Sequence, residues 1–297
     1  MGYRFKHKEP FADGVRRIGK EQLSRIARQL ALDTDRALAV HDARKGLKRM
    51  RALLRLIRPV VDNRWLREQD AAYREIARGL ADMRDVDSAL ACIAKLEVAA
   101  KSLAANAALV RLKAQLQVQR DALQTGAIDA TSAKARKALK AAARRFAAVK
   151  LDRRGFTIVG RGLALTCEQG RRLQARAYGN GADADFHRWR KRVQHHWRHM
   201  QLLARAWPEA MAAREALARE LAELLGDEHD LTELACEIKR RASDLGPAGA
   251  VLSLQRACAA RKAELRRLAE PRGRRLLAEH GKALARRIER YWDHPVG

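Results

Sequence analysis

The sequence predicts an all-α protein built from two helical bundles, and three observations carry this prediction. Apolar residues recur at spacings of three and four along most of the chain, with little of the strict alternation that strands show. Only six prolines occur in 297 residues, so few positions interrupt a helix. Apolar residues make up 47% and charged residues 33% of the chain, a balance typical of helical bundles and too apolar for a disordered basic tail.

The periodicity predicts twelve helices, and turn-forming residues fall between several of them. The main breakers are, in order, Pro59, Gly126, Gly179 to Gly181, and Gly246 with Pro247. The expected helices span residues 13–32, 36–58, 63–82, 86–101, 103–124, 132–150, 156–178, 183–206, 209–225, 231–245, 248–269 and 272–292.

An internal repeat appears when the two halves of the chain are aligned. Three blocks match in order at offsets of 147, 146 and 145 residues: Glu21-Gln22 with Glu168-Gln169, His41-x-x-Arg44-Lys45 with His187-x-x-Arg190-Lys191, and Leu80-x-Asp82-x-x-Asp85 with Leu225-x-Asp227-x-x-Asp230. Collinear matches at nearly one offset indicate a duplication. We therefore expect a first helical repeat over residues 1–152 and a second over 153–297, related by a pseudo-two-fold axis.

The charge balance indicates an anionic partner. Lys and Arg number 62 against 35 Asp and Glu, a formal net charge of +27. Such a surface repels itself unless a polyanion or an anionic membrane compensates it. A polyanion is the leading expectation, and no membrane partner is expected because no long apolar run occurs.

The helix expected over residues 36–58 concentrates this charge. It carries eight Lys or Arg residues and one acid, Asp42. At about 100° per residue the cations form one stripe, and the opposite face is apolar core. A solvated charged face is the alternative, but like charges at i,i+4 destabilise a helix, and no acid interrupts the stripe. The ligand-binding residues predicted here are His41, Arg44, Lys45, Lys48, Arg49, Arg51 and Arg55.

The helix expected over residues 183–206 repeats this design with fewer cations. Arg188 and Arg192 are expected to point away from its stripe, so the second half should bind a ligand less strongly. The ligand-binding residues predicted here are His187, Arg190, Lys191 and Arg198.

The other histidines of this helix are read as structural. Trp189 and His196 lie among apolar neighbours and are expected in the core. His195 and His199 have the i,i+4 spacing of a zinc pair, but a third ligand is not evident. A polar flank is expected there, with no metal site and no cofactor.

Asp85 and Asp230 occupy equivalent places in the third repeated block. The sequence Asp230-Leu231-Thr232-Glu233 has the form of a capping box, so both aspartates are expected to cap a helix N-terminus. The alternative is that they orient neighbouring arginines toward a ligand.

Motifs for catalysis are missing from the sequence. No GxSxG, Cys/His pair or P-loop occurs, and the four cysteines form no CxxC motif. Buried, reduced thiols are expected. Because these motifs are missing, no enzymatic activity is expected. The basic start of the chain has no apolar segment typical of a signal peptide, so a cytoplasmic protein is expected.

The basic helix with its echo at His187 and the two Asp blocks resembles the CHAD family, the conserved histidine α-helical domain. Gly170-Arg171-Arg172 is similar to a Gly-Arg segment of that family, so Arg171 and Arg172 join the predicted site. The resemblance implies a helical fold with a basic central surface that binds inorganic polyphosphate, and a location at polyphosphate granules in the cytoplasm. The ExExK motif of the CYTH hydrolase domain sometimes fused to this family is absent.

Polyphosphate also suits the residues themselves. A flexible chain of phosphates requires rows of Arg and Lys, whose charged groups match phosphate oxygens. Binders of single-stranded nucleic acid intersperse aromatic residues among the cations, and aromatic residues are only 5% here. Sequence-nonspecific binding of nucleic acid by the same surface is the alternative.

Overall fold

Eleven α-helices and two short 3-10 helices form the chain, as described by a computed structural model over residues 2–31, 36–80, 82–97, 103–124 and 128–295. The predicted all-α class is confirmed. The elements are α1 (Phe11–Gln29), α2 (Arg36–Ile57), η1 (Arg58–Val60), α3 (Asn63–Gly79), α4 (Asp82–Glu97), α5 (Leu103–Gln124), α6 (Ile128–Ala147), α7 (Thr157–Asn180), α8 (Asp183–Leu202), α9 (Pro208–Arg240), η2 (Ala242–Asp244), α10 (Ala248–Leu276) and α11 (Gly281–Asp293). None of the helices in these ranges is both long and apolar enough to cross a bilayer.

One continuous helix, α9, replaces two expected helices, so the predicted cap at Asp230 is wrong. Asp227 and Glu228 lie inside this helix and pair with side chains of other helices. Asp227 pairs with Lys95 of α4 at 2.6 Å, and Glu228 pairs with Arg266 of α10. The helix therefore runs through the region where the sequence suggested a junction.

The expected break at Pro271 is also wrong, because α10 continues through it. Proline removes one backbone hydrogen bond of the helix. Side chains supply donors to carbonyls of the neighbouring turns: the Tyr178 hydroxyl donates to Arg266 O at 2.6 Å and Gln174 Nε2 to Glu270 O at 3.1 Å. These donors from α7 stabilise the helix on both sides of the proline.

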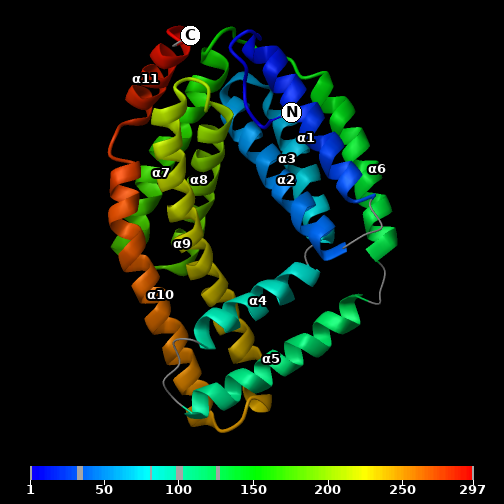
Figure 1. Ribbon diagram of the computed structural model, residues 1–297, viewed down its shortest axis with the longest axis vertical. Coiled ribbons are helices and arrows are strands. Elements are labelled where there is room, and N and C mark those ends of the chain that lie inside the picture. Colours follow the sequence, from blue (N-terminus) through cyan, green and yellow to red (C-terminus); the bar gives the residue numbers. More distant parts are fainter. Residues whose placement is uncertain (1, 32–35, 81, 98–102, 125–127, 296–297) are drawn as a thin grey trace.

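Two separate hydrophobic cores hold the molecule together. The larger contains buried side chains of α1–α3, α6–α8, α11 and the adjoining ends of α9 and α10. The smaller joins α4 and α5 to the other ends of α9 and α10, with Leu112, Leu234 and Leu254 buried in it. Figure 1 shows this arrangement, in which α4 and α5 reach across to α9 and α10 at one end of the molecule. The second half thus shares both cores with the first.

α2 packs closely on its neighbours because two glycines permit it. A Cβ added at Gly162 of α7 would lie 1.8 Å from the Leu56 carbonyl oxygen, so α7 can cross α2 here only without a side chain. A Cβ at Gly46 of α2 would lie 2.4 Å from Ile26 of α1. These contacts fix which face of α2 is turned toward α8.

The two halves use a similar order of packing. α1 packs on α2 and α6, and α7 packs on α8 and α11. α4 packs on α5, and α9 packs on α10. A duplication would produce this parallel, and the boundary predicted at residues 152–153 falls between α6 and α7. The duplication and the boundary stay predictions.

Candidate functional site

A cavity of 930 Å³ lies among α2, α4, α5, α8 and α9. Both predicted basic helices face it, α2 from the first half and α8 from the second. Among the side chains that the structure describes, nine Lys or Arg line it against three Asp or Glu. The cations are Arg44, Lys48, Arg51, Arg55, Arg190, Lys191, Arg192, Arg198 and Arg240.

On α2, a buried carboxylate from α3 orients two of these guanidiniums. Arg51 Nε donates to Asp70 Oδ1 at 2.8 Å, and Arg55 Nη2 donates to Asp70 Oδ2 at 3.1 Å. Asp70 is only 7% exposed, and Arg74 forms a third ion pair with it at 3.4 Å. Burial by itself would raise the pKa of Asp70, but the three guanidiniums lower it overall, with the Arg51 hydrogen bond foremost. Asp70 therefore stays ionised and holds Arg51 and Arg55 in place.

Arg44 has a role in the fold as well as in the cavity. Its Nη1 donates to the carbonyls of Ala77 at 2.6 Å and Leu80 at 3.0 Å, at the C-terminal end of α3. A cation at this end of a helix interacts favourably with the helix dipole. The contact fixes both the Arg44 side chain and the end of α3.

On α8, cations lie close to those of α2. Burial lowers the pKa of Lys191, and the positive charge of Arg51 lowers it further. Burial likewise lowers the pKa of Arg192, helped by Arg55 and Arg58. The prediction that Arg192 points away from the site is wrong, since α8 turns this side chain into the cavity, whereas Arg188 pairs with Asp185 at 2.9 Å. α2 and α8 each contribute four cations to the lining.

Two histidines stack at the edge of α8 and α9. The ring centroids of His187 and His229 are 4.2 Å apart, and both side chains line the cavity. Burial, followed by the charges of Lys191 and Arg190, lowers the pKa of His187 to about 4. His187 is therefore neutral at pH 7, and its imidazole ring can accept a proton beside these cations.

The α9 side of the cavity is more acidic. Asp230, Glu233 and Glu237 line it, and Glu237 forms ion pairs with Arg240 and Arg241. Cys236 also lines this side and is exposed, so the expectation of buried thiols holds only for the other three cysteines. Asp230 lines the cavity from the middle of a helix rather than at the predicted cap. The Asp85 side chain lies outside the described residues.

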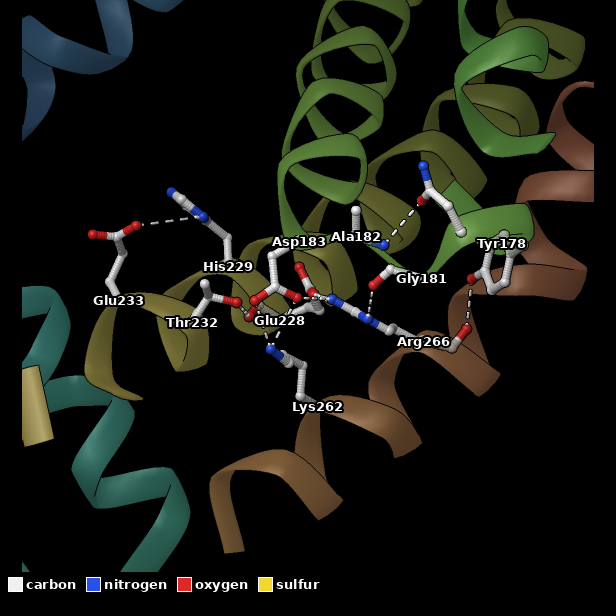
Figure 2. A network of polar contacts seen from close by, with 11 residues as sticks. Tyr178, Gly181, Ala182, Asp183, Glu228, His229, Thr232, Glu233, Lys262 and Arg266 are labelled. Carbon is white, nitrogen blue, oxygen red and sulfur yellow. Dashed lines mark hydrogen bonds and ion pairs between the residues drawn. The ribbon is translucent and has the colours of Figure 1, made fainter. Parts of the chain in front are cut away.

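A polar network behind His229 joins α8, α9 and α10, as Figure 2 shows. Arg266 of α10 pairs with Asp183 at the start of α8 and with Glu228 of α9, and it donates to Gly181 O at 2.8 Å. Lys262 adds an ion pair to Asp183 at 2.9 Å. The network sets the position of His229, next to Glu228, relative to α8.

Five predicted site residues do not line the cavity. His41 is exposed on α2 almost one turn before Arg44. Lys45 and Arg49 face α1, because at about 100° per residue they lie well off the stripe that contains Lys48 and Arg51. The remaining two, on α7, bond to backbone: Arg171 donates to Leu277 O and Ala278 O, and Arg172 to Glu168 O.

The structural reading of α8 is confirmed for Trp189 and His196 and wrong for His199. Trp189 and His196 are buried in the core at 0% and 1% exposure. His199 is also fully buried, with Nε2 2.9 Å from Ala52 O, so the expected polar flank is wrong for this residue. His195 lines the cavity. No cluster of three or more metal-ligating side chains occurs within the described ranges.

Asp70 is a residue of the candidate site that was not predicted from the sequence, as are Arg240 and His229 of the lining. Asp70 lies at helical spacing from Leu66 and Tyr73, both buried, so its side chain falls on the inward face of α3. An acid on an apolar face requires a buried cation as partner, and the neighbouring basic helix supplies one. That pattern could have identified it.

The fold and the cavity define a class of all-helical proteins in which two basic helices from different halves of the chain line one cavity rich in cations. A family model described as the CHAD domain matches residues 17–239, so the chain belongs to the CHAD family. Family membership supports a role related to polyphosphate in general terms.

Two solved structures share the fold. PptA from Streptomyces chartreusis is similar with a TM-score of 0.62 and 18% sequence identity, covering 96% of this chain and 100% of that chain. The CHAD domain from the plant Ricinus communis is similar with a TM-score of 0.68 and 15% identity, covering 94% of this chain and 95% of that one. A comparison with curated proteins gave no match.

Proposed function

We propose that this protein binds inorganic polyphosphate in the central cavity without chemically changing it. The observation that carries the proposal is the convergence of four cations from α2 and four from α8 on one cavity. Burial, and after it the repulsion from arginines of α2, lowers the pKa of Lys191 and Arg192 there. A phosphate chain between the two helices relieves this repulsion and accepts charge-assisted hydrogen bonds. Membership of the CHAD family supports the same ligand.

Nucleic acid is the second candidate, and the shape of the site favours polyphosphate over it. The cavity lies among five helices, and the part of its lining that the structure describes contains no Phe, Tyr or Trp to stack on bases. Its acidic side on α9 would also repel the second strand of a duplex. A thin chain of phosphates contacts the cationic walls without either penalty.

Competition at physiological salt tests this proposal. Fluorescently labelled long-chain polyphosphate is displaced by unlabelled polyphosphate, single-stranded DNA or duplex DNA of matched charge. We expect unlabelled polyphosphate to displace the label at concentrations at least tenfold lower than either DNA. The reverse order would establish nucleic acid as the ligand.

Absence of hydrolysis is the second part of the proposal. The cations of the cavity bind phosphate, but phosphoryl transfer also requires a metal or an activated water. Incubation with polyphosphate and Mg²⁺ or Mn²⁺ should release no orthophosphate above buffer. Release that disappears in a Lys191→Glu variant would show that the cavity is catalytic.

Binding of this kind suits a cytoplasmic protein that associates with polyphosphate granules. Microscopy of a fluorescent fusion in cells with and without polyphosphate tests this location. We expect foci that disappear in cells without polyphosphate and with Lys191→Glu.

A further inference from the structure

A second, smaller cleft lies between α1 and α2. Its volume is 50 Å³, room for roughly four water-sized groups. It contains Lys45 and Arg49 of α2, which do not line the central cavity, together with Arg25 of α1. The cleft therefore combines positive charge from two helices in a space far smaller than the cavity.

The cleft carries more positive than negative charge. Arg25 and Lys45 are exposed and Arg49 is half-buried. Among the described residues the carboxylate at the cleft is Asp42, which accepts a hydrogen bond from Gln29 at 3.3 Å. Burial lowers the pKa of Arg49, the neighbouring charge of Arg25 lowers it further, and Asp42 opposes these effects. Asp42 thus offsets one of three cations.

Gly46 allows the two helices that form the cleft to approach each other closely. A Cβ at this position would lie 2.4 Å from Ile26, so α1 and α2 approach here only because residue 46 has no side chain. The approach brings Arg25 to the same cleft as Lys45 and Arg49. The cleft is therefore set by the backbone packing of two helices.

A buried polar group at the cleft lacks a hydrogen-bond partner. Gln22 is 6% exposed, and its Oε1 accepts no hydrogen bond although it is fully buried. An unsatisfied buried group of this kind costs about 1–3 kcal/mol. A half-turn of the amide presents its NH2 group instead, which would donate to an anion in the cleft.

We propose that this cleft is a second anion site, which takes a single phosphoryl group and is separate from the central cavity. Its size excludes a base or a sugar, and its lining supplies cations and an amide. The group can be free orthophosphate or the terminal phosphate of a polyphosphate chain, and only the latter case rests on the proposed function.

Calorimetric titration with sodium orthophosphate, and separately with long-chain polyphosphate, tests the site. The cleft variant is Arg25→Gln with Lys45→Gln, both exposed and therefore compatible with folding. The matched control is Lys20→Gln with Arg28→Gln, which removes the same charge from exposed positions on α1 outside the cleft. A third variant, Lys48→Glu with Lys191→Glu, disables the central cavity. Circular dichroism confirms that each variant is helical.

We expect orthophosphate to bind the wild type at one site, at least fivefold more weakly to the cleft variant, and unchanged to the control and the cavity variant. In a nuclear magnetic resonance titration of the wild type with orthophosphate, the amide resonance of Gly46 should shift, because Gly46 lines the cleft. If orthophosphate fails to bind but the cleft variant weakens polyphosphate binding at least threefold, the phosphoryl group is the chain end.

Two results would overturn the proposal. In the first, orthophosphate binding is lost in the cavity variant and kept in the cleft variant. In the second, the cleft variant behaves as the control does with both ligands. If polyphosphate binds neither the wild type nor any variant, the proposed function is refuted. The orthophosphate titrations then decide on their own whether the cleft binds an anion.

Discussion

Asp70 shows how one residue arranges a cationic site. Its carboxylate accepts from Arg51 and Arg55, which neutralises part of their charge but fixes their direction toward the cavity. Guanidiniums that are already oriented lose less entropy when a phosphate binds. The acid therefore supports anion binding although it carries the wrong sign for direct contact.

Replacement of Asp70 by Asn should lower both stability and polyphosphate affinity. We expect a loss of about 2 kcal/mol in the free energy of unfolding, less than for a fully buried pair because Arg51 and Arg55 are partly exposed. Because the guanidiniums lower the pKa of Asp70 in the folded protein, its contribution is present above the unfolded pKa and is lost as pH falls through the folded value.

Urea unfolding at several pH values measures this effect. The difference between wild type and Asp70→Asn should be constant near neutral pH and shrink below about pH 4. Exposed Glu68→Gln, on the same helix, is the control. A difference that is independent of pH down to pH 2 would contradict the ionised role of Asp70.

His187 should make binding depend on pH. Its pKa is about 4 without ligand, and a phosphate beside it favours the protonated form and raises that pKa. The complex then binds more protons than the free protein, so affinity increases as pH falls through the pKa of the complex and levels off near pH 4. For a complex pKa near 6, the gain from pH 7 to pH 5 is about tenfold.

Affinity for long-chain polyphosphate at pH 5, 6 and 7 measures this prediction. His187→Gln should flatten the dependence, and His41→Ala should leave it intact, because His41 lies outside the cavity. The opposite pattern would make His41, one of the ligand-binding residues predicted from the sequence, the proton acceptor.

At the scale of elements, the position of α2 depends on its crossing with α7. The Leu56 carbonyl lies where a side chain of residue 162 would be, so the separation of the two helices is fixed by the absence of that side chain. α2 carries the cations that face α8, and a shift of α2 displaces all of them together. This crossing links a packing contact to the geometry of the cavity.

Gly162→Ala should therefore destabilise the protein even though alanine favours helices. The clash is with backbone, which cannot rotate away, and overpacking of this kind costs about 1–3 kcal/mol. Gly179→Ala on the same helix is the matched control, because a Cβ there meets nothing within 4 Å. The control should be neutral or stabilise by up to about 1 kcal/mol.

Thermal unfolding of both variants decides the matter. The expected result is a lower midpoint for Gly162→Ala and an equal or higher midpoint for Gly179→Ala. Equal midpoints for the two variants would mean that α7 and α2 can separate without cost.

At the scale of the whole molecule, both halves of the chain line the cavity, with four cations each from α2 and α8. The sequence predicted a weaker second half, but α8 places Arg190, Lys191 and Arg192 at the cavity beside those of α2. Lys48→Glu and Lys191→Glu should therefore weaken polyphosphate binding to a similar extent, about tenfold each. Lys140→Glu, an exposed charge reversal on α6, should have little effect.

Affinities at two salt concentrations check this symmetry. Binding should weaken steeply between about 50 and 200 mM salt, because each contact with a phosphate releases a counterion. Each cavity variant should also reduce the slope, and the α6 variant should not. A tenfold larger effect at Lys48 than at Lys191 would restore the original expectation of unequal halves.

The sequence predicted the helical class and the two basic helices because both depend on local periodicity. The continuous α9 was not predicted, because the ion pairs that hold this stretch, Asp227 with α4 and Glu228 with α10, join residues far apart in the sequence. Lys45 and Arg49 were expected at the central site because the sequence of one helix does not show which of its faces the neighbouring helices cover. Asp70 was missed for the same reason, since its partners are 15 and 19 residues away.

The smaller core has a consequence for how the chain is made. α4 and α5 close onto α9 and α10 through contacts such as Lys95 with Asp227 and Arg111 with Leu245, 132 and 134 residues apart. At about 5–20 residues per second, a ribosome needs on the order of ten seconds to supply those partners. During that interval the apolar side chains of the α4–α5 hairpin are exposed in the nascent chain. The ribosome therefore makes α4 and α5 before α9 and α10, which cover their apolar side chains. A chain that ends early keeps these side chains exposed and is prone to aggregation.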